Sequence, residues 1–150
     1  MKNLLFMFLI FLFSKCGTDQ GEARKYDYSI INSSGVVIEI IPYSNGIKYN
    51  DRKIILNNNQ LINKVETIYP PYGGGIRTIS ALFPNFRVNK IDIIFNGTKK
   101  VSYEDCSATN NCNAQPKNIF NHEFHDELTE VYTITPEDFE AAEDCGGNCN

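Results

Sequence analysis

The chain has 150 residues, 42% of them hydrophobic, and its 14 basic and 18 acidic residues give a net charge of −4. This hydrophobic content is typical of a packed protein and excludes a disordered chain, and the length suits one domain. The negative charge argues against nucleic acid as a partner, because nucleic-acid binding needs basic residues that neutralise phosphates.

The N-terminus has the pattern of a secretory leader. Lys2 precedes an apolar run over residues 4–13, which is shorter than the about 20 residues that cross a bilayer. Residues 12–16, Leu-Phe-Ser-Lys-Cys, resemble the lipobox of bacterial lipoproteins, whose Cys thiol receives a diacylglyceryl group and becomes the mature N-terminus. The resemblance implies a signal peptide at residues 1–15 and lipidation of Cys16. The alternative is a secreted protein cut near the same point.

The residues after Cys16 are polar and predict a flexible tether up to residue 25. Nine residues reach at most ~30 Å, enough to clear lipid headgroups. Residues 26–150 then form a single domain. Cleavage would remove Lys2 and Lys15 and leave a mature chain of net charge −6.

Alternating apolar and polar residues predict the first strands. Residues 26–30 form a half-buried strand, and residues 36–41 form a second strand that Pro42 ends. The Ser-Ser-Gly turn at residues 33–35 predicts that the two pair as a hairpin. Further strands are expected at residues 47–49, 53–56 and 61–69.

Residues 69–75 contain two prolines and three glycines and predict an exposed loop. Tyr69, Tyr72 and Arg77 form a candidate contact patch for a glycan or a protein. The alternative is a long connection held by its prolines. A strand is expected at residues 76–82.

The clearest hairpin joins residues 90–95 to residues 98–103 through Asn96-Gly97, which favours a type I′ turn. A short strand is expected at Ile119-Phe120, and another at residues 128–134.

A short helix is predicted after Thr135, which can cap it, with Pro136 in the first helical position. Gly146-Gly147 would end it. Residues 118–150 hold nine acidic residues and no Lys or Arg, whereas residues 48–100 hold nine Lys or Arg. We interpret this asymmetry as an acidic end that packs near a basic middle; the alternative is an oriented binding surface.

Five cysteines are present, and lipidation of Cys16 would leave an even four. Disulfides are favoured over zinc, because the spacings C-x5-C and C-x3-C fit zinc sites poorly. Pairing of Cys106 with Cys112 and of Cys145 with Cys149 would close two short loops. A crossed pairing would tie the C-terminus to the middle of the domain.

No motif predicts catalysis, a metal or a cofactor. His122-Glu-Phe-His125-Asp126 differs from H-E-x-x-H by one position, and two exposed histidines in an acidic loop are favoured over a weak metal site. The nucleophile motif G-x-S-x-G is absent. We therefore expect no enzyme.

Seven to nine short antiparallel strands with frequent turns and a short C-terminal helix predict an Ig-like β-sandwich; a small α+β domain is the alternative.

The chain resembles the short, uncharacterised lipoproteins of Bacteroidota in its leader and in two segments, residues 28–35 and 132–142. The resemblance implies a location at the outer membrane, on its periplasmic or surface face. The expected function is a non-catalytic binding or structural module with a membrane anchor and a protein or glycan partner. The alternatives are an inhibitor or immunity-type lipoprotein that blocks a protein, and an envelope hydrolase.

Overall fold

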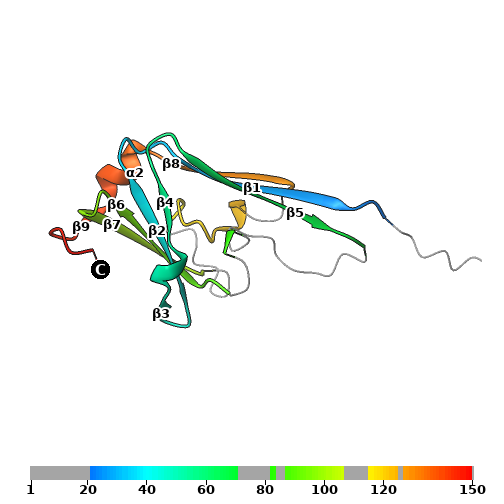
Figure 1. Cartoon of the computed structure of the whole chain (residues 1–150), viewed down its shortest axis with the longest axis horizontal. Helices are drawn as coiled ribbons and strands as arrows, with labels where there is room; N and C mark the ends of the chain where they lie inside the picture. Colours follow the sequence, from blue (N-terminus) through cyan, green and yellow to red (C-terminus); the bar gives the residue numbers. More distant parts are fainter. Residues whose placement is uncertain (1–20, 71–81, 84–86, 107–114, 125–126, 150) are drawn as a thin grey trace, which may run out of the picture.

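The protein is mainly β, with two sheets and one short α-helix in the part of the chain that the computed structural model describes (Figure 1). The structure describes residues 21–70, 82–83, 87–106, 115–124 and 127–149. The predicted two-sheet, sandwich-like architecture is confirmed. No helix among these residues has the length and apolar character needed to cross a membrane.

One sheet has three strands, in the order β5 (Leu61–Ile68), β1 (Arg24–Asn32) and β8 (Thr129–Ile134). β1 is antiparallel to β5 but parallel to β8, which departs from the expected all-antiparallel arrangement. The chain between β1 and β8 runs through the other sheet, so no tight turn forces the two strands to oppose each other. β1 begins at Arg24, two residues inside the segment assigned to the tether.

The second sheet has the order β3 (Ile47–Lys48), β2 (Ile38–Ser44), β6 (Lys90–Phe95), β7 (Lys99–Glu104) and β9 (Glu143–Asp144), and β4 (Ile54–Leu56) also pairs with β2. The predicted hairpin is confirmed in β6 and β7. Asn96 and Gly97 have φ angles of 48° and 69°, as a type I′ turn requires. β2 continues through the buried Pro42 instead of ending there.

The predicted hairpin between the first two strands is wrong, because β1 and β2 lie in different sheets. The buried Asn32 ends β1. Its Nδ2 donates to Val36 O at 2.8 Å and Leu56 O at 2.9 Å, and its Oδ1 accepts from Ser34 Oγ at 2.7 Å. Gly35 has a φ of +86°. These contacts turn the chain away from β1 and into the second sheet.

The hydrophobic core lies between the sheets. Both contribute fully buried side chains, among them Ile30, Ile38, Ile40, Ile91, Ile93, Phe95 and Ile134. Ile119 and Phe120 are also buried but lie in a turn, not in the expected strand. The Phe120 N–H donates to Asn118 Oδ1 at 3.0 Å, which favours a turn over an extended backbone.

The C-terminal helix is confirmed as α2 (Pro136–Ala141). Thr135 and Asp138 form a capping box, in which the Thr135 N–H donates to Asp138 Oδ2 at 2.8 Å. The helix ends before Gly146-Gly147, because Ala142 is already extended and leads into β9. Two short 3-10 helices, η1 (Asn50–Arg52) and η4 (His122–Phe124), complete the described elements.

The acidic end packs against the basic middle, as expected. β9 pairs with β7, with Asp144 opposite Lys99. Lys99 Nζ also donates to the carbonyl oxygens of Phe139 at 3.2 Å and Glu140 at 3.0 Å, where a cation stabilises the last turn of a helix.

Candidate functional site

The outer face of the six-stranded sheet is partly covered and partly charged. On β6, Ile91, Ile93 and Phe95 belong to the core between the sheets. Because side chains alternate along a strand, Lys90, Asp92 and Ile94 project from the opposite face. There, Ile94 forms a second small apolar cluster with Ile41 and Cys149.

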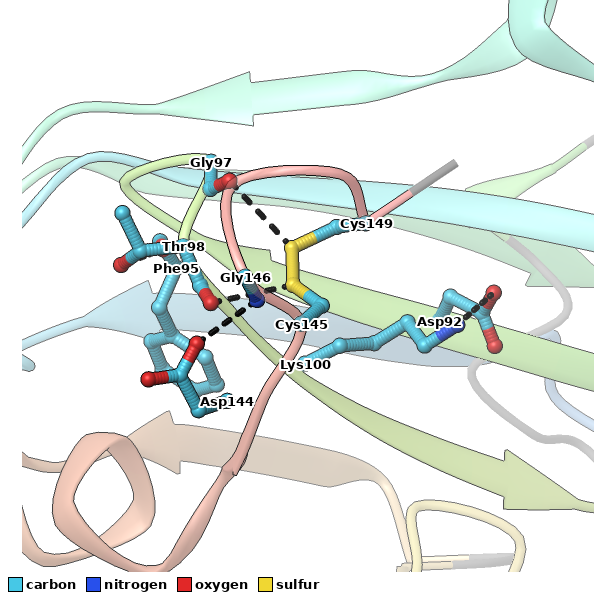
Figure 2. The surroundings of a disulfide bond; sticks show 9 residues. All are labelled: Asp92, Phe95, Gly97, Thr98, Lys100, Asp144, Cys145, Gly146 and Cys149. Atoms are coloured by element: carbon cyan, nitrogen blue, oxygen red, sulfur yellow. Dashed lines mark hydrogen bonds and ion pairs between the residues drawn. A yellow bond between two sulfur atoms is a disulfide. The ribbon is translucent and has the colours of Figure 1, made fainter.

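A disulfide bond between Cys145 and Cys149 covers one end of this face (Figure 2). The Cys145 N–H donates to Thr98 O at 2.9 Å, and Cys149 Sγ lies 3.3 Å from Gly97 O. The C-terminal loop therefore lies against the turn between β6 and β7. Cys106 is also disulfide-bonded, while Cys112 and Cys16 lie outside the described residues.

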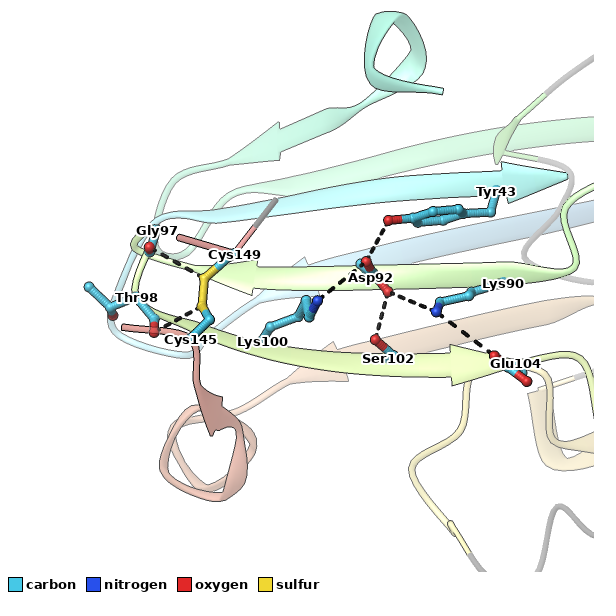
Figure 3. Close-up of polar contacts among 10 residues, drawn as sticks. All are labelled: Tyr43, Lys90, Asp92, Gly97, Thr98, Lys100, Ser102, Glu104, Cys145 and Cys149. Atoms are coloured by element: carbon cyan, nitrogen blue, oxygen red, sulfur yellow. Dashed lines mark hydrogen bonds and ion pairs between the residues drawn. A yellow bond between two sulfur atoms is a disulfide. The ribbon is translucent and has the colours of Figure 1, made fainter. Parts of the chain in front are cut away.

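Asp92 lies at the centre of the outer face and is only 2% exposed. Tyr43 Oη donates to its Oδ2 and Ser102 Oγ to its Oδ1, each at 2.7 Å. Lys90 Nζ lies 3.9 Å from Oδ1 and Lys100 Nζ 4.0 Å from Oδ2 (Figure 3). These four partners compensate the carboxylate for the loss of water.

Asp92 fixes the positions of two neighbouring side chains. Burial and the hydrogen bond to Asp92 raise the pKa of the Tyr43 phenol well above its ordinary value, so the phenol stays a donor. Lys90 Nζ lies 5.3 Å from the centre of the Tyr43 ring, within the range of a cation–π contact. Tyr43 and Lys90 therefore form one wall held from behind by Asp92.

This wall faces an open, polar pocket of about 400 Å³. The pocket lies where β2 turns into β3, where β6 begins and where β7 ends. Its lining residues are Tyr43, Asn45, Gly46, Arg87, Asn89, Lys90, Glu104 and Asp105.

Two loose ion pairs lie in the pocket. Arg87 Nη2 is 3.6 Å from Asp105 Oδ2, and Lys90 Nζ is 3.8 Å from Glu104 Oε1. The side chains of Arg87 and Glu104 are 85% and 76% exposed, so each pair is weak and easily rearranged. The Asn45 N–H donates to Asn89 Oδ1 at 3.1 Å, which joins the turn to the start of β6.

Of the contact patch predicted from sequence, the structure describes Tyr69. Tyr69 follows β5 and is 72% exposed, but it does not line the pocket. Tyr72 and Arg77 lie outside the described residues, as do residues 76–81 of the strand expected over residues 76–82; Leu82, its last residue, is described and is not in a strand.

His122 lies in η4, while His125 and Asp126 lie outside the described residues. Within the part of the chain that the structure describes, no three His, Cys, Asp or Glu side chains come together as metal ligands would.

Sequence reasoning missed Tyr43, Lys90 and Asp92, although one signal was present. A two-residue turn fixes the register of the hairpin that it joins, so Asn96-Gly97 places Asp92 opposite Ser102 and Lys90 opposite Glu104. An Asp within an apolar strand, opposite a residue that bears a hydroxyl group, predicts a buried polar cluster. Tyr43 comes from a distant strand and carried no such signal.

Searches of protein-family models, curated proteins and solved structures find no significant match to this chain.

Proposed function

We propose that this protein is a lipid-anchored component of the cell envelope and acts as a non-catalytic binding module. The anchor is supported by the leader that ends at Cys16 and by the resemblance to short lipoproteins of Bacteroidota. The binding role rests on one observation, the open polar pocket of about 400 Å³ beside the Tyr43–Lys90 wall. Its volume lies within the usual range of small-molecule sites.

The direction of the chain agrees with an anchor at the N-terminal end. β1, which follows the tether, starts toward one end of the long axis, while α2 and β9 lie toward the other end (Figure 1). An anchor at Cys16 would therefore hold the protein by one end and leave the disulfide-bonded end pointing away from the membrane.

The environment of Asp92 supports binding over hydrolysis. Both of its oxygens are occupied by hydroxyl donors at 2.7 Å, and it is 2% exposed. A general acid or base must reach the proton that it transfers, and this carboxylate is enclosed by its own partners.

Metabolic labelling with a palmitate analogue tests the anchor. We expect the wild-type chain to be labelled and Cys16→Ser to lose the label. Lys15→Ala is the matched control, since it places a small residue next to an unchanged thiol and should label at least as strongly as the wild type. Equal labelling of Cys16→Ser would contradict the anchor.

An NMR screen tests the binding role. Polar probes of several classes (hexoses, amino acids, nucleosides and short carboxylic acids) are added to the mature chain. We expect at least one class to shift the backbone amide signals of Asn45, Gly46 and Asn89 while those of Asn63, on the other sheet, stay in place. If no class shifts the pocket signals, the binding role is wrong.

A further inference from the structure

We propose that the outer face of the three-stranded sheet is an interface through which two copies of this chain form a weak dimer. The inference goes beyond the proposed binding role of the pocket and does not depend on it.

Nine side chains form this outer face. Tyr28, Ile30 and Tyr132 are buried on the core side of the sheet, so the residues between them in β1, β5 and β8 project outward. The strand register arranges the outward residues in three rows: Val65-Asp27-Thr129, Asn63-Ser29-Val131 and Leu61-Ile31-Thr133.

The composition of the face is unusual for a solvated surface. Four of the nine residues are aliphatic, and Leu61, Val65 and Val131 are 56%, 42% and 47% exposed. Among the nine, Lys, Arg and Glu are absent, although such long charged side chains normally keep an exposed sheet soluble. A contiguous apolar surface of this kind indicates a contact with another protein surface.

The polar residues of the face are partly satisfied within it. Asn63 Nδ2 donates to Asp27 Oδ1, and it lies 3.0 Å from Ser29 Oγ. These three side chains therefore keep hydrogen bonds to one another when the water above them is displaced, which lowers the cost of covering the face.

The charge of the face favours a second copy as its occupant. With Asp27 as its one charged residue, the face offers little attraction to a strongly acidic or basic partner. It fits a surface that is itself flat, aliphatic and nearly neutral, and the same face of another copy has these properties. The outer face of the six-stranded sheet does not, because Asp92 and Lys100 project there and the disulfide loop covers part of it.

A two-fold axis across the strands, above Ser29, makes the face complementary to itself. The outer rows then exchange, so Val65 meets Leu61, Thr129 meets Thr133, and Val131 meets Val131 of the second copy. Each Asp27 lies two residues from the axis, so for sheets packed about 10 Å apart the two carboxylates are about 17 Å from each other. Salt largely screens charges at that separation. Such an isologous contact is closed, and association stops at the dimer.

The size of the face sets the strength of the dimer. Nine residues are fewer than the about 20–30 that each side of a stable interface contributes. We therefore expect a transient dimer with a dissociation constant on the order of 100 μM.

Sedimentation velocity and NMR dilution test the proposal on residues 16–150 with Cys16→Ser, which carries neither a lipid nor the Cys16 thiol. Between about 10 μM and about 1 mM we expect a monomer–dimer equilibrium. The amide signals of Ser29, Val65 and Val131 should move with protein concentration, while those of Asn45 and Asn89 on the other sheet stay in place.

Val131→Lys is the decisive variant, because it places two like charges against each other across the axis. It should raise the dissociation constant at least about tenfold. Ile55→Lys is the matched control, since Ile55 is 50% exposed on the other sheet and its replacement should leave the dimer unchanged. Circular dichroism checks that both variants fold.

A mixture of Val131→Lys with Val131→Glu tests the two-fold arrangement directly. Opposite charges now meet across the axis, so the mixture should associate more tightly than either variant alone. A wild-type chain that stays monomeric at about 1 mM would overturn the proposal, and so would a Val131→Lys chain that dimerises as the wild type does. Oligomers larger than a dimer, or a mixture that associates no better than its components, would also overturn it.

Discussion

The outer faces of the two sheets are built in opposite ways. On the six-stranded sheet, the outer face carries a buried carboxylate, a covering disulfide loop and a pocket. On the three-stranded sheet, the outer face carries no such cover. Its apolar side chains remain 42–56% exposed: Leu61, Val65 and Val131.

Each face carries one aspartate in the middle of a strand, and the two show the difference most clearly. Asp92 is enclosed by four partners. Asp27 projects from β1 on the outer face of the other sheet, where Asn63 Nδ2 donates to its Oδ1, and it remains partly exposed. Burial of a charge is costly unless it is compensated, so Asp92 depends on its polar partners to a degree that the partly exposed Asp27 does not.

The largest expected effect comes from exchanging these aspartates for alanine. Asp92→Ala should lower the free energy of unfolding by about 2 to 3 kcal/mol, because it leaves two half-buried hydroxyls, of Tyr43 and Ser102, without their acceptor. Asp27→Ala should change it by less than about 0.5 kcal/mol. Urea unfolding of the two variants measures both values. Equal losses would mean that the two faces do not differ as described.

A smaller effect should come from the disulfide that covers the same face. The double variant Cys145→Ser/Cys149→Ser should lose about 2 kcal/mol, the value for closing so short a loop in the unfolded chain. The reducing agent dithiothreitol supplies the control. It opens the Cys145–Cys149 bond in the wild type and the Cys106 disulfide in both proteins, so the unfolding curves of the two reduced proteins should converge. A difference that persists under reduction would assign the loss to packing of Cys149 against Ile41 and Ile94.

The smallest effect concerns pH. Since burial and Asp92 raise the pKa of Tyr43 in the folded state, its stabilisation is complete below the ordinary tyrosine pKa of about 10 and is lost as the pH rises above it. The buried Tyr132, whose pKa is also raised, contributes in the same direction. Stability should therefore fall steadily as the pH rises above about 10.

Tyr43→Phe should reduce this alkaline loss without removing it, whereas the exposed Tyr69→Phe should not alter it. Thermal unfolding across the pH range compares the three proteins. If Tyr43→Phe loses stability with rising pH as steeply as the wild type does, the role given to the Tyr43–Asp92 hydrogen bond is wrong.

Local patterns predicted local structure well. The Asn96-Gly97 turn and the Thr135-Pro136 start determine their own backbone conformations, so β6, β7 and α2 could be read directly. The pairing between distant strands could not be predicted from local patterns. The direction of β8 against β1, and the diversion of the chain at Asn32, depend on contacts with residues far along the sequence.

The site was harder to predict than the strands that carry it. Lys90, Asp92 and Ser102 are close in sequence, and their pairing follows from one turn. Tyr43 and Asn45 reach the same place only because β2 pairs with β6. A sequence search for polar clusters finds neighbours along the chain, and this cluster joins two segments more than forty residues apart.

The position of β1 has a consequence for how the protein folds. The first strand of the sandwich is the central strand of its sheet, and its partner β8 begins more than a hundred residues later. Contacts of such long range make folding slow, and the three-stranded sheet cannot be completed until the chain has been made as far as Ile134. The pairing that completes the three-stranded sheet is therefore among the last to become possible as the chain is made.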